Sequence, residues 1–160
     1  MTDAATGRKR TDSASRLVHA SPQTIYRAFL DPEAWISWLP PEGMNGHIDA
    51  FDAREGGGYR MTLRYDDAEY AEAGKTLENA DVVEGWFLKF VPNERIVQRV
   101  EFETDDPQFA GAMTMTWSLG AVPGGTEVTI LCENVPEGIS KQDHDAALKS
   151  TLENLAAFVE

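Results

Sequence analysis

The fold is decided by one stretch, residues 111–159, which reads GAMTMTWSLGAVPGGTEVTILCENVPEGISKQDHDAALKSTLENLAAFV. Its first half alternates apolar and polar side chains on both sides of Pro123-Gly124-Gly125, and its second half repeats apolar residues at helical spacing. A period of two indicates strands with one buried face, and a repeat every three to four residues indicates an amphipathic helix. We therefore predict two antiparallel strands, Gly111–Gly120 and Thr126–Asn134, followed by a long helix, Lys141–Val159.

The alternation also predicts which side chains share a face. Met113, Met115 and Trp117 lie on the apolar side of their strand, and the helix carries a stripe that includes Leu148 and Leu152. A sheet with one apolar face must bury that face against another element. At about 1.5 Å per residue the helix is nearly 30 Å long, enough to cover a whole sheet.

Upstream residues complete the element order. Ser21-Pro22 and Asp31-Pro32 each place a capping residue before a proline, a pattern typical of helix starts. The predicted helices are Pro22–Leu30 and Glu33–Leu39, and the further predicted strands are Ser13–Ala20, His47–Ala53, Gly58–Tyr65, Asp81–Val91 and Glu94–Glu103. We expect an α+β domain over residues 13–160, a curved antiparallel sheet of about seven strands wrapped around the C-terminal helix, after a disordered tail at residues 1–12.

The charge and the cysteine content limit which partners and which cellular location we expect. Lys and Arg number 14 and Asp and Glu number 27, which gives a net charge of −13. Such a surface repels phosphate backbones and anionic headgroups, so we expect neither nucleic acid nor membrane as a partner. Cys132 is the single cysteine. It lies in an alternating strand, where we expect a buried, inert thiol, and a reducing cytoplasmic location fits a chain without disulfides.

The acidic stretch Asp66–Ala80 predicts a flexible loop. Within it, Gly74-Lys75-Thr76 resembles part of a phosphate-binding loop, but Glu69 stands where that motif needs a glycine. We therefore expect no nucleotide site.

Several motifs resemble the START-like helix-grip superfamily, in the branch named after the activator of heat-shock-protein-90 ATPase. They are Asp52-Ala53-Arg54-Glu55-Gly56-Gly57, similar to a D-x-R-x-G-G turn, Trp35-Ile36-Ser37-Trp38, Asn134–Ile139, Asp143-His144 and Leu152–Ala156. Members often carry Gly-Trp where this chain has Ala147-Leu148. The resemblance covers nearly the whole chain and implies a helix-grip fold with a cavity between sheet and helix. Superfamily members bind lipids, hormones, polyketides or chaperones.

We predict that a small apolar molecule binds in this cavity. The predicted lining residues are Trp35, Trp38, Tyr59, Met61, Trp86, Gln98, Phe102, Met113, Met115, Trp117, His144, Leu148 and Leu152. The competing interpretation is a filled core. Gln98 lies among apolar neighbours and must find a partner, a water or a ligand. His144 could face the cavity mouth or lie at the surface.

No motif specifies a reaction. The three histidines show no metal-ligand spacing, so we expect neither a metal nor a cofactor. Arg54 is expected to pair with a neighbouring acid and fix the bend. Two alternatives to ligand binding stay open: a polyketide-cyclase-like enzyme, which needs a desolvated acid or histidine pointing inward, and a chaperone-associated protein. A homodimer would cover the exposed sheet edges of such a domain.

Overall fold

The computed structural model describes residues 10–65 and 80–160. The elements are β1 (Arg10–Val18), α1 (Pro22–Arg27), α2 (Pro32–Trp38), β2 (Met44–Phe51), β3 (Gly58–Tyr65), β4 (Ala80–Val91), β5 (Arg95–Phe102), β6 (Met113–Val122), β7 (Gly125–Val135) and α3 (Lys141–Val159). The predicted element order is confirmed. The predicted acidic loop and its Gly74-Lys75-Thr76 lie outside the described residues, apart from Ala80, which begins β4.

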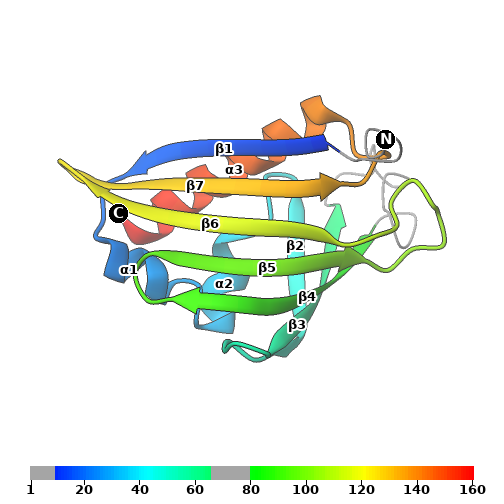
Figure 1. Cartoon of the computed structure of the whole chain (residues 1–160), viewed down its shortest axis with the longest axis horizontal. Coiled ribbons are helices and arrows are strands. Elements are labelled where there is room, and N and C mark those ends of the chain that lie inside the picture. Colours follow the sequence, from blue (N-terminus) through cyan, green and yellow to red (C-terminus); the bar gives the residue numbers. More distant parts are fainter. Residues whose placement is uncertain (1–9, 66–79) are drawn as a thin grey trace, which may run out of the picture.

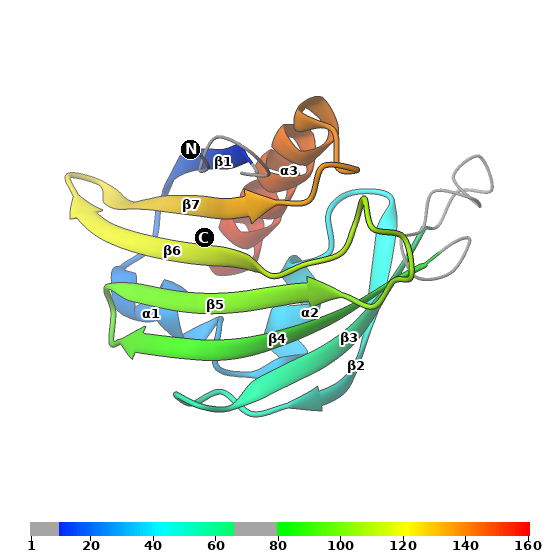
Figure 2. The same cartoon turned by 45° about the vertical axis from the view of Figure 1, so that its right-hand side comes forward.

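One seven-stranded antiparallel sheet has the order β1-β7-β6-β5-β4-β3-β2. The first strand pairs with the last, so the two ends of the domain meet at one edge of the sheet. The three helices lie on the same side of the sheet (Figure 1), and the curvature of the sheet toward them is visible in Figure 2. α3 runs along this side, and the two short helices α1 and α2 lie toward one end of the sheet. This arrangement is the predicted α+β helix-grip fold.

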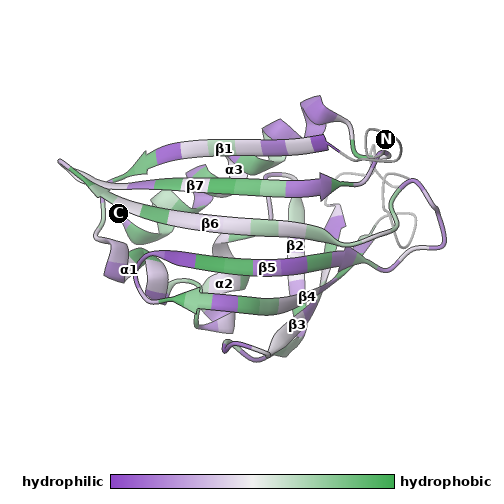
Figure 3. Cartoon of the chain, in the orientation of Figure 1, coloured by the Kyte–Doolittle hydropathy of each residue, from purple (hydrophilic) through white to green (hydrophobic). Residues whose placement is uncertain are grey.

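The core lies between the sheet and the helices. Hydrophobic and hydrophilic bands alternate along the strands in Figure 3, as expected for a sheet with one buried face. The rings of Phe29, Trp35, Trp38 and Trp117 pack against one another with centroids 4.9–5.7 Å apart. Cys132 is fully buried, as predicted, and burial and the charge of Asp12 raise the pKa of its thiol to about 12. That thiol is protonated at neutral pH.

The chain enters the sheet earlier than predicted. β1 begins at Arg10, three residues before the predicted start, so residues 10–12 belong to the domain. Arg10 pairs with Val135 and Asp12 with Cys132 across the β1–β7 ladder. The prediction was wrong here because the polar sequence gives no apolar alternation, whereas pairing with β7 satisfies the backbone hydrogen bonds regardless of side-chain type.

The charged turn after β2 has a structural role. Arg54 Nε lies 2.8 Å from Asp52 Oδ2, so the predicted pairing of Arg54 with a neighbouring acid is confirmed. Gly56 adopts φ +83°, a conformation that residues with a Cβ rarely adopt. The Glu55 carboxylate accepts a hydrogen bond of 3.0 Å from the Phe90 backbone N–H at the end of β4. These contacts hold the β2–β3 turn against β4.

Candidate ligand-binding hollow

An inner hollow of about 130 Å³ lies between the sheet, the end of α2 and the first half of α3. Ten of the thirteen predicted residues line it: Trp35, Tyr59, Met61, Gln98, Phe102, Met113, Met115, Trp117, His144 and Leu148. The strand residues among them reach the hollow because each occupies an inward position of β3, β5 or β6. Whether they bind a ligand stays a prediction.

The remaining three predicted residues lie elsewhere. Trp86 lies on the outer side of the sheet, 37% exposed, with the Arg99 guanidinium 5.3 Å from its ring centroid. Phe87 is fully buried and points inward instead. The prediction for Trp86 was wrong because β4 has no clear alternation in sequence and its pairing with β5 shifts register after Phe87. Trp38 and Leu152 are buried in the core, outside the lining of the hollow.

Sequence reasoning also missed part of the wall. Leu63, Val83 and Val100 line the hollow, and alternation with Met61 and Gln98 could have found Leu63 and Val100. Leu39, Pro41, Ala147 and Thr151 complete the missed set. The Thr151 hydroxyl donates to the Leu39 carbonyl oxygen at 3.0 Å and so ties α3 to the end of α2. Such a contact between distant elements has no local sequence signal.

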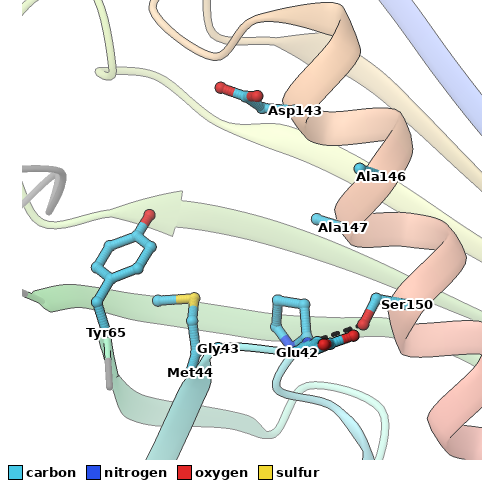
Figure 4. Close-up of a pocket in the computed structure, with 9 residues that line it drawn as sticks. Glu42, Gly43, Met44, Tyr65, Asp143, Ala146, Ala147 and Ser150 are labelled. Atoms are coloured by element: carbon cyan, nitrogen blue, oxygen red, sulfur yellow. Dashed lines mark hydrogen bonds between the residues drawn. The ribbon is translucent and has the colours of Figure 1, made fainter. Parts of the chain in front are cut away.

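A wider hollow of about 560 Å³ adjoins the inner one and shares Pro41 and Ala147 with it. Figure 4 shows Ala147 and Ser150 of α3 on one side of this outer hollow, with Met44 and Tyr65 across from them. The Glu42 backbone N–H donates to Ser150 Oγ at 2.8 Å and closes one end. Burial and the charges of Asp81 and Asp143 raise the pKa of Tyr65 to about 12, so its hydroxyl is protonated at neutral pH.

Polar groups of the inner hollow are few and mostly donors. Tyr59 is buried, which raises the pKa of its phenol, and its hydroxyl donates to Gln98 Oε1 at 3.2 Å. The predicted need of Gln98 for a partner is met at its oxygen. Its Nε2 has no hydrogen-bond partner among the described residues, and neither does the indole N–H of Trp35 or of Trp117.

One titratable pair reaches the wall of the hollow. His144 Nδ1 lies 2.7 Å from Asp12 Oδ2, and Arg10 Nε lies 2.9 Å from Asp12 Oδ1. Burial alone raises the pKa of Asp12, but hydrogen bonds and charges from Arg10 and His144 outweigh it, so this pKa lies below its ordinary value. An Nδ1–H bonded to the carboxylate leaves the lone pair of the neutral ring on Nε2.

Asp12 was not predicted as part of any site. It lies 132 residues from His144 in the chain, and only the pairing of β1 beside α3 brings the two together. Within residues 10–65 and 80–160, no cluster of three or more His, Cys, Asp or Glu side chains is placed to hold a metal ion. In the same residues, no helix has both the length and the apolar character needed to cross a bilayer.

Comparison with known proteins places this architecture in a family. Solved structures superpose on nearly the whole chain. A protein from Chromobacterium violaceum is 33% identical with a TM-score of 0.82, and the match covers 94% of this chain and 96% of the other. A protein from Mesorhizobium loti, 18% identical over 93% of this chain and 96% of the other, has a TM-score of 0.69 and shares the fold.

A protein from Arthrobacter aurescens gives a TM-score of 0.76 at 13% identity, with 93% of this chain and 85% of the other covered. None of the curated proteins matches the chain significantly in sequence. The sequence profile described as "Activator of Hsp90 ATPase homolog 1-like protein" matches residues 19–160. The chain therefore belongs to the Activator of Hsp90 ATPase homolog 1-like family, as the motifs around Asp52 and Trp35 indicated.

Proposed function

We propose that this protein binds a small, largely apolar molecule, with a ring-sized group in the inner hollow and the remainder in the outer one. The observation that carries the proposal is the inner hollow itself, which is walled almost entirely by apolar and aromatic side chains. Packed protein interiors leave few voids larger than a water molecule, so an opening of this kind inside the core needs an explanation.

Size supports one aromatic or alicyclic ring as the buried group. An apolar cavity of roughly 150 Å³ stays dry and takes up benzene. The inner hollow, at about 130 Å³, is close to that size, and the adjoining outer hollow of about 560 Å³ falls in the range of ordinary ligand pockets. Met113 and Met115 form part of the wall, and their flexible side chains adapt to the shape of a ligand.

Filling the hollow tests the proposal. We expect native mass spectrometry of the purified protein to detect a substoichiometric apolar passenger. Met115→Trp should remove it and weaken binding of added ring compounds at least tenfold, since the larger side chain occupies the space. Trp86→Ala is the matched control, because Trp86 lies on the outer face and should leave binding unchanged. An empty wild-type protein with no thermal shift across a library of aromatic compounds would contradict the proposal.

A second candidate function is proton transfer on the bound molecule, which the Asp12–His144 pair favours. A polyketide-cyclase-like enzyme needs a desolvated titratable group at the cavity, and the ring of His144 lies at the wall with its Nδ1 held by a buried carboxylate. Nε2 can accept a proton from carbon beside a ligand carbonyl. The C–H electron pair then forms an enolate, and return of a proton from Nε2 restores the ketone.

Deuterium exchange tests this second function without knowledge of the natural ligand. In D₂O, the methyl protons of acetophenone should exchange faster with the protein than without it, as followed by proton NMR. His144→Gln should bring the rate back to the background. A wild-type rate equal to background at saturating acetophenone would rule out proton transfer on this probe.

A further inference from the structure

The inner hollow combines apolar walls with an excess of unused hydrogen-bond donors. Gln98, Trp35 and Trp117 are each 1% exposed, and each carries a side-chain N–H without a partner in the described part of the chain. All three residues line the hollow. A buried donor without a partner costs about 1–3 kcal/mol, so three around one small space indicate an acceptor that enters from outside.

The three donors come from different elements but lie within one neighbourhood. Gln98 pairs with Met115 across β5 and β6, which makes Trp117 its diagonal neighbour on the inner face. The ring of Trp35, on α2, packs against Tyr59 with centroids 5.6 Å apart, and the Tyr59 hydroxyl bonds to Gln98. The Tyr59 hydroxyl donates its hydrogen bond to the Gln98 side-chain oxygen. The N–H groups of the Gln98 amide therefore stay available for another acceptor.

The charges around the inner hollow indicate whether the acceptor on the ligand is charged or neutral. Among the described residues that line the inner hollow there is no Lys, Arg, Asp or Glu. His144 also lines the hollow, but its ring already contacts the Asp12 carboxylate at 2.7 Å. A ligand carboxylate would therefore lack a counter-ion of its own, and an unpaired buried charge is far more costly than an unpaired dipole. A neutral carbonyl oxygen offers two lone pairs and no charge, so it matches the donors at low desolvation cost.

We infer that the ligand of the inner hollow carries a neutral carbonyl oxygen on its ring-sized group, and that Gln98, Trp35 and Trp117 bind this oxygen. The inference rests on the proposed function and adds the chemical class of the ligand. It also separates this site from a purely lipophilic cavity, because a hydrocarbon of the same shape would leave the donors unsatisfied.

Three probes of nearly equal shape test the inference on the full chain. Acetophenone carries the carbonyl oxygen, α-methylstyrene replaces that oxygen with a CH₂ group, and benzoate carries a charged carboxylate. We expect acetophenone to bind about fivefold tighter than α-methylstyrene in ¹H–¹⁵N NMR titrations, the difference that one net hydrogen bond supplies. Benzoate should bind most weakly of the three.

Variants that lack one N–H donor test whether Gln98 and Trp117 cause the preference for acetophenone over α-methylstyrene. Gln98→Met and Trp117→Phe remove N–H donors while keeping apolar bulk, and each should lower the acetophenone preference with little change for α-methylstyrene. Trp38→Phe is the matched control. Its indole N–H already donates to the Ala28 carbonyl oxygen at 3.0 Å, and it does not line the hollow, so the preference should persist.

The outcomes separate the two proposals. Equal affinity of the wild type for acetophenone and α-methylstyrene would overturn the carbonyl inference and leave ligand binding standing. A preference that survives in both donor variants would also overturn the assignment to Gln98 and Trp117. If neither ring compound binds the wild-type protein, the proposed function itself fails, and the inference fails with it. The wild-type comparison decides the question even where a variant does not fold.

Discussion

Tyr59 and Gln98 bond to each other although their strands are not neighbours. β4 lies between β3 and β5, so the Tyr59 ring must cross β4 to reach Gln98. It crosses at Gly85, the residue that pairs with Tyr59 in register. A Cβ atom added to Gly85 would overlap the Tyr59 ring. The missing side chain of Gly85 is therefore what allows this wall of the hollow to form.

Gly85→Ala should displace the Tyr59 ring and break its bond to Gln98. We expect the free energy of unfolding, measured by urea denaturation, to fall by about 1–3 kcal/mol, as is usual when a packed core receives an extra group. Gly120→Ala is the matched control. The nearest atom to a Cβ there is the Glu127 carbonyl oxygen at 3.9 Å, so the change should stay within about 0.5 kcal/mol. Equal effects of the two variants would contradict the crossing role of Gly85.

Among the elements, β1 and α3 are joined by the contacts of one buried carboxylate. Asp12 of β1 bonds to His144 of α3, and Lys141 Nζ of the same helix lies 3.7 Å from Asp12 Oδ1. The side chain of Asp12 is fully buried, so its charge relies on these partners and on Arg10. This tie holds the N-terminal end of α3, and hence His144, at the hollow.

Asp12→Asn should lower the free energy of unfolding by about 2 kcal/mol at pH 7, because it removes charge-assisted hydrogen bonds. The pKa of Asp12 is lowered in the folded state, so its stabilisation is complete above the ordinary carboxyl pKa and is lost as pH falls through the folded value. The difference in the free energy of unfolding between wild type and Asp12→Asn, measured by urea denaturation, should therefore become smaller from pH 7 to about pH 3.

Asp145→Asn serves as the control for this pair. Asp145 also contacts Lys141, at 3.1 Å, but its side chain is 43% exposed and that of Lys141 is 63% exposed, and surface pairs of this kind contribute about 0.5 kcal/mol or less. A gap between wild type and Asp12→Asn that stays constant across the pH range would show that the carboxylate charge is not the stabilising feature.

At the scale of the whole molecule, the two hollows follow from how one helix meets a curved sheet. The sheet bends around α3, and two small residues of that helix, Ala146 and Ala147, border the outer hollow, where a larger side chain would occupy part of the space. Ala147 borders both hollows, so they adjoin at this residue. The family resemblance had identified Ala147-Leu148 as a departure from Gly-Trp, and the structure shows that both residues border the inner hollow.

The sequence by itself determined the fold and most of the inner face. Alternation in β3, β5, β6 and β7 is a local property of the chain, and proline and capping residues marked the starts of α1 and α2. The bounds of α3 were predicted as found, because its apolar stripe is a local signal. The same alternation correctly placed Met113, Met115 and Trp117 on the inner face.

Tertiary structure alone decided the contacts that give the site its chemistry. The face of Trp86 depends on a register shift between two strands, and the pairing of Asp12 with His144 joins residues from opposite ends of the chain. The passage of Tyr59 over Gly85 and the unpartnered donors of Trp35, Gln98 and Trp117 depend on packing between elements. Sequence periodicity reports which face a residue occupies, whereas these interactions depend on which distant residue shares that face.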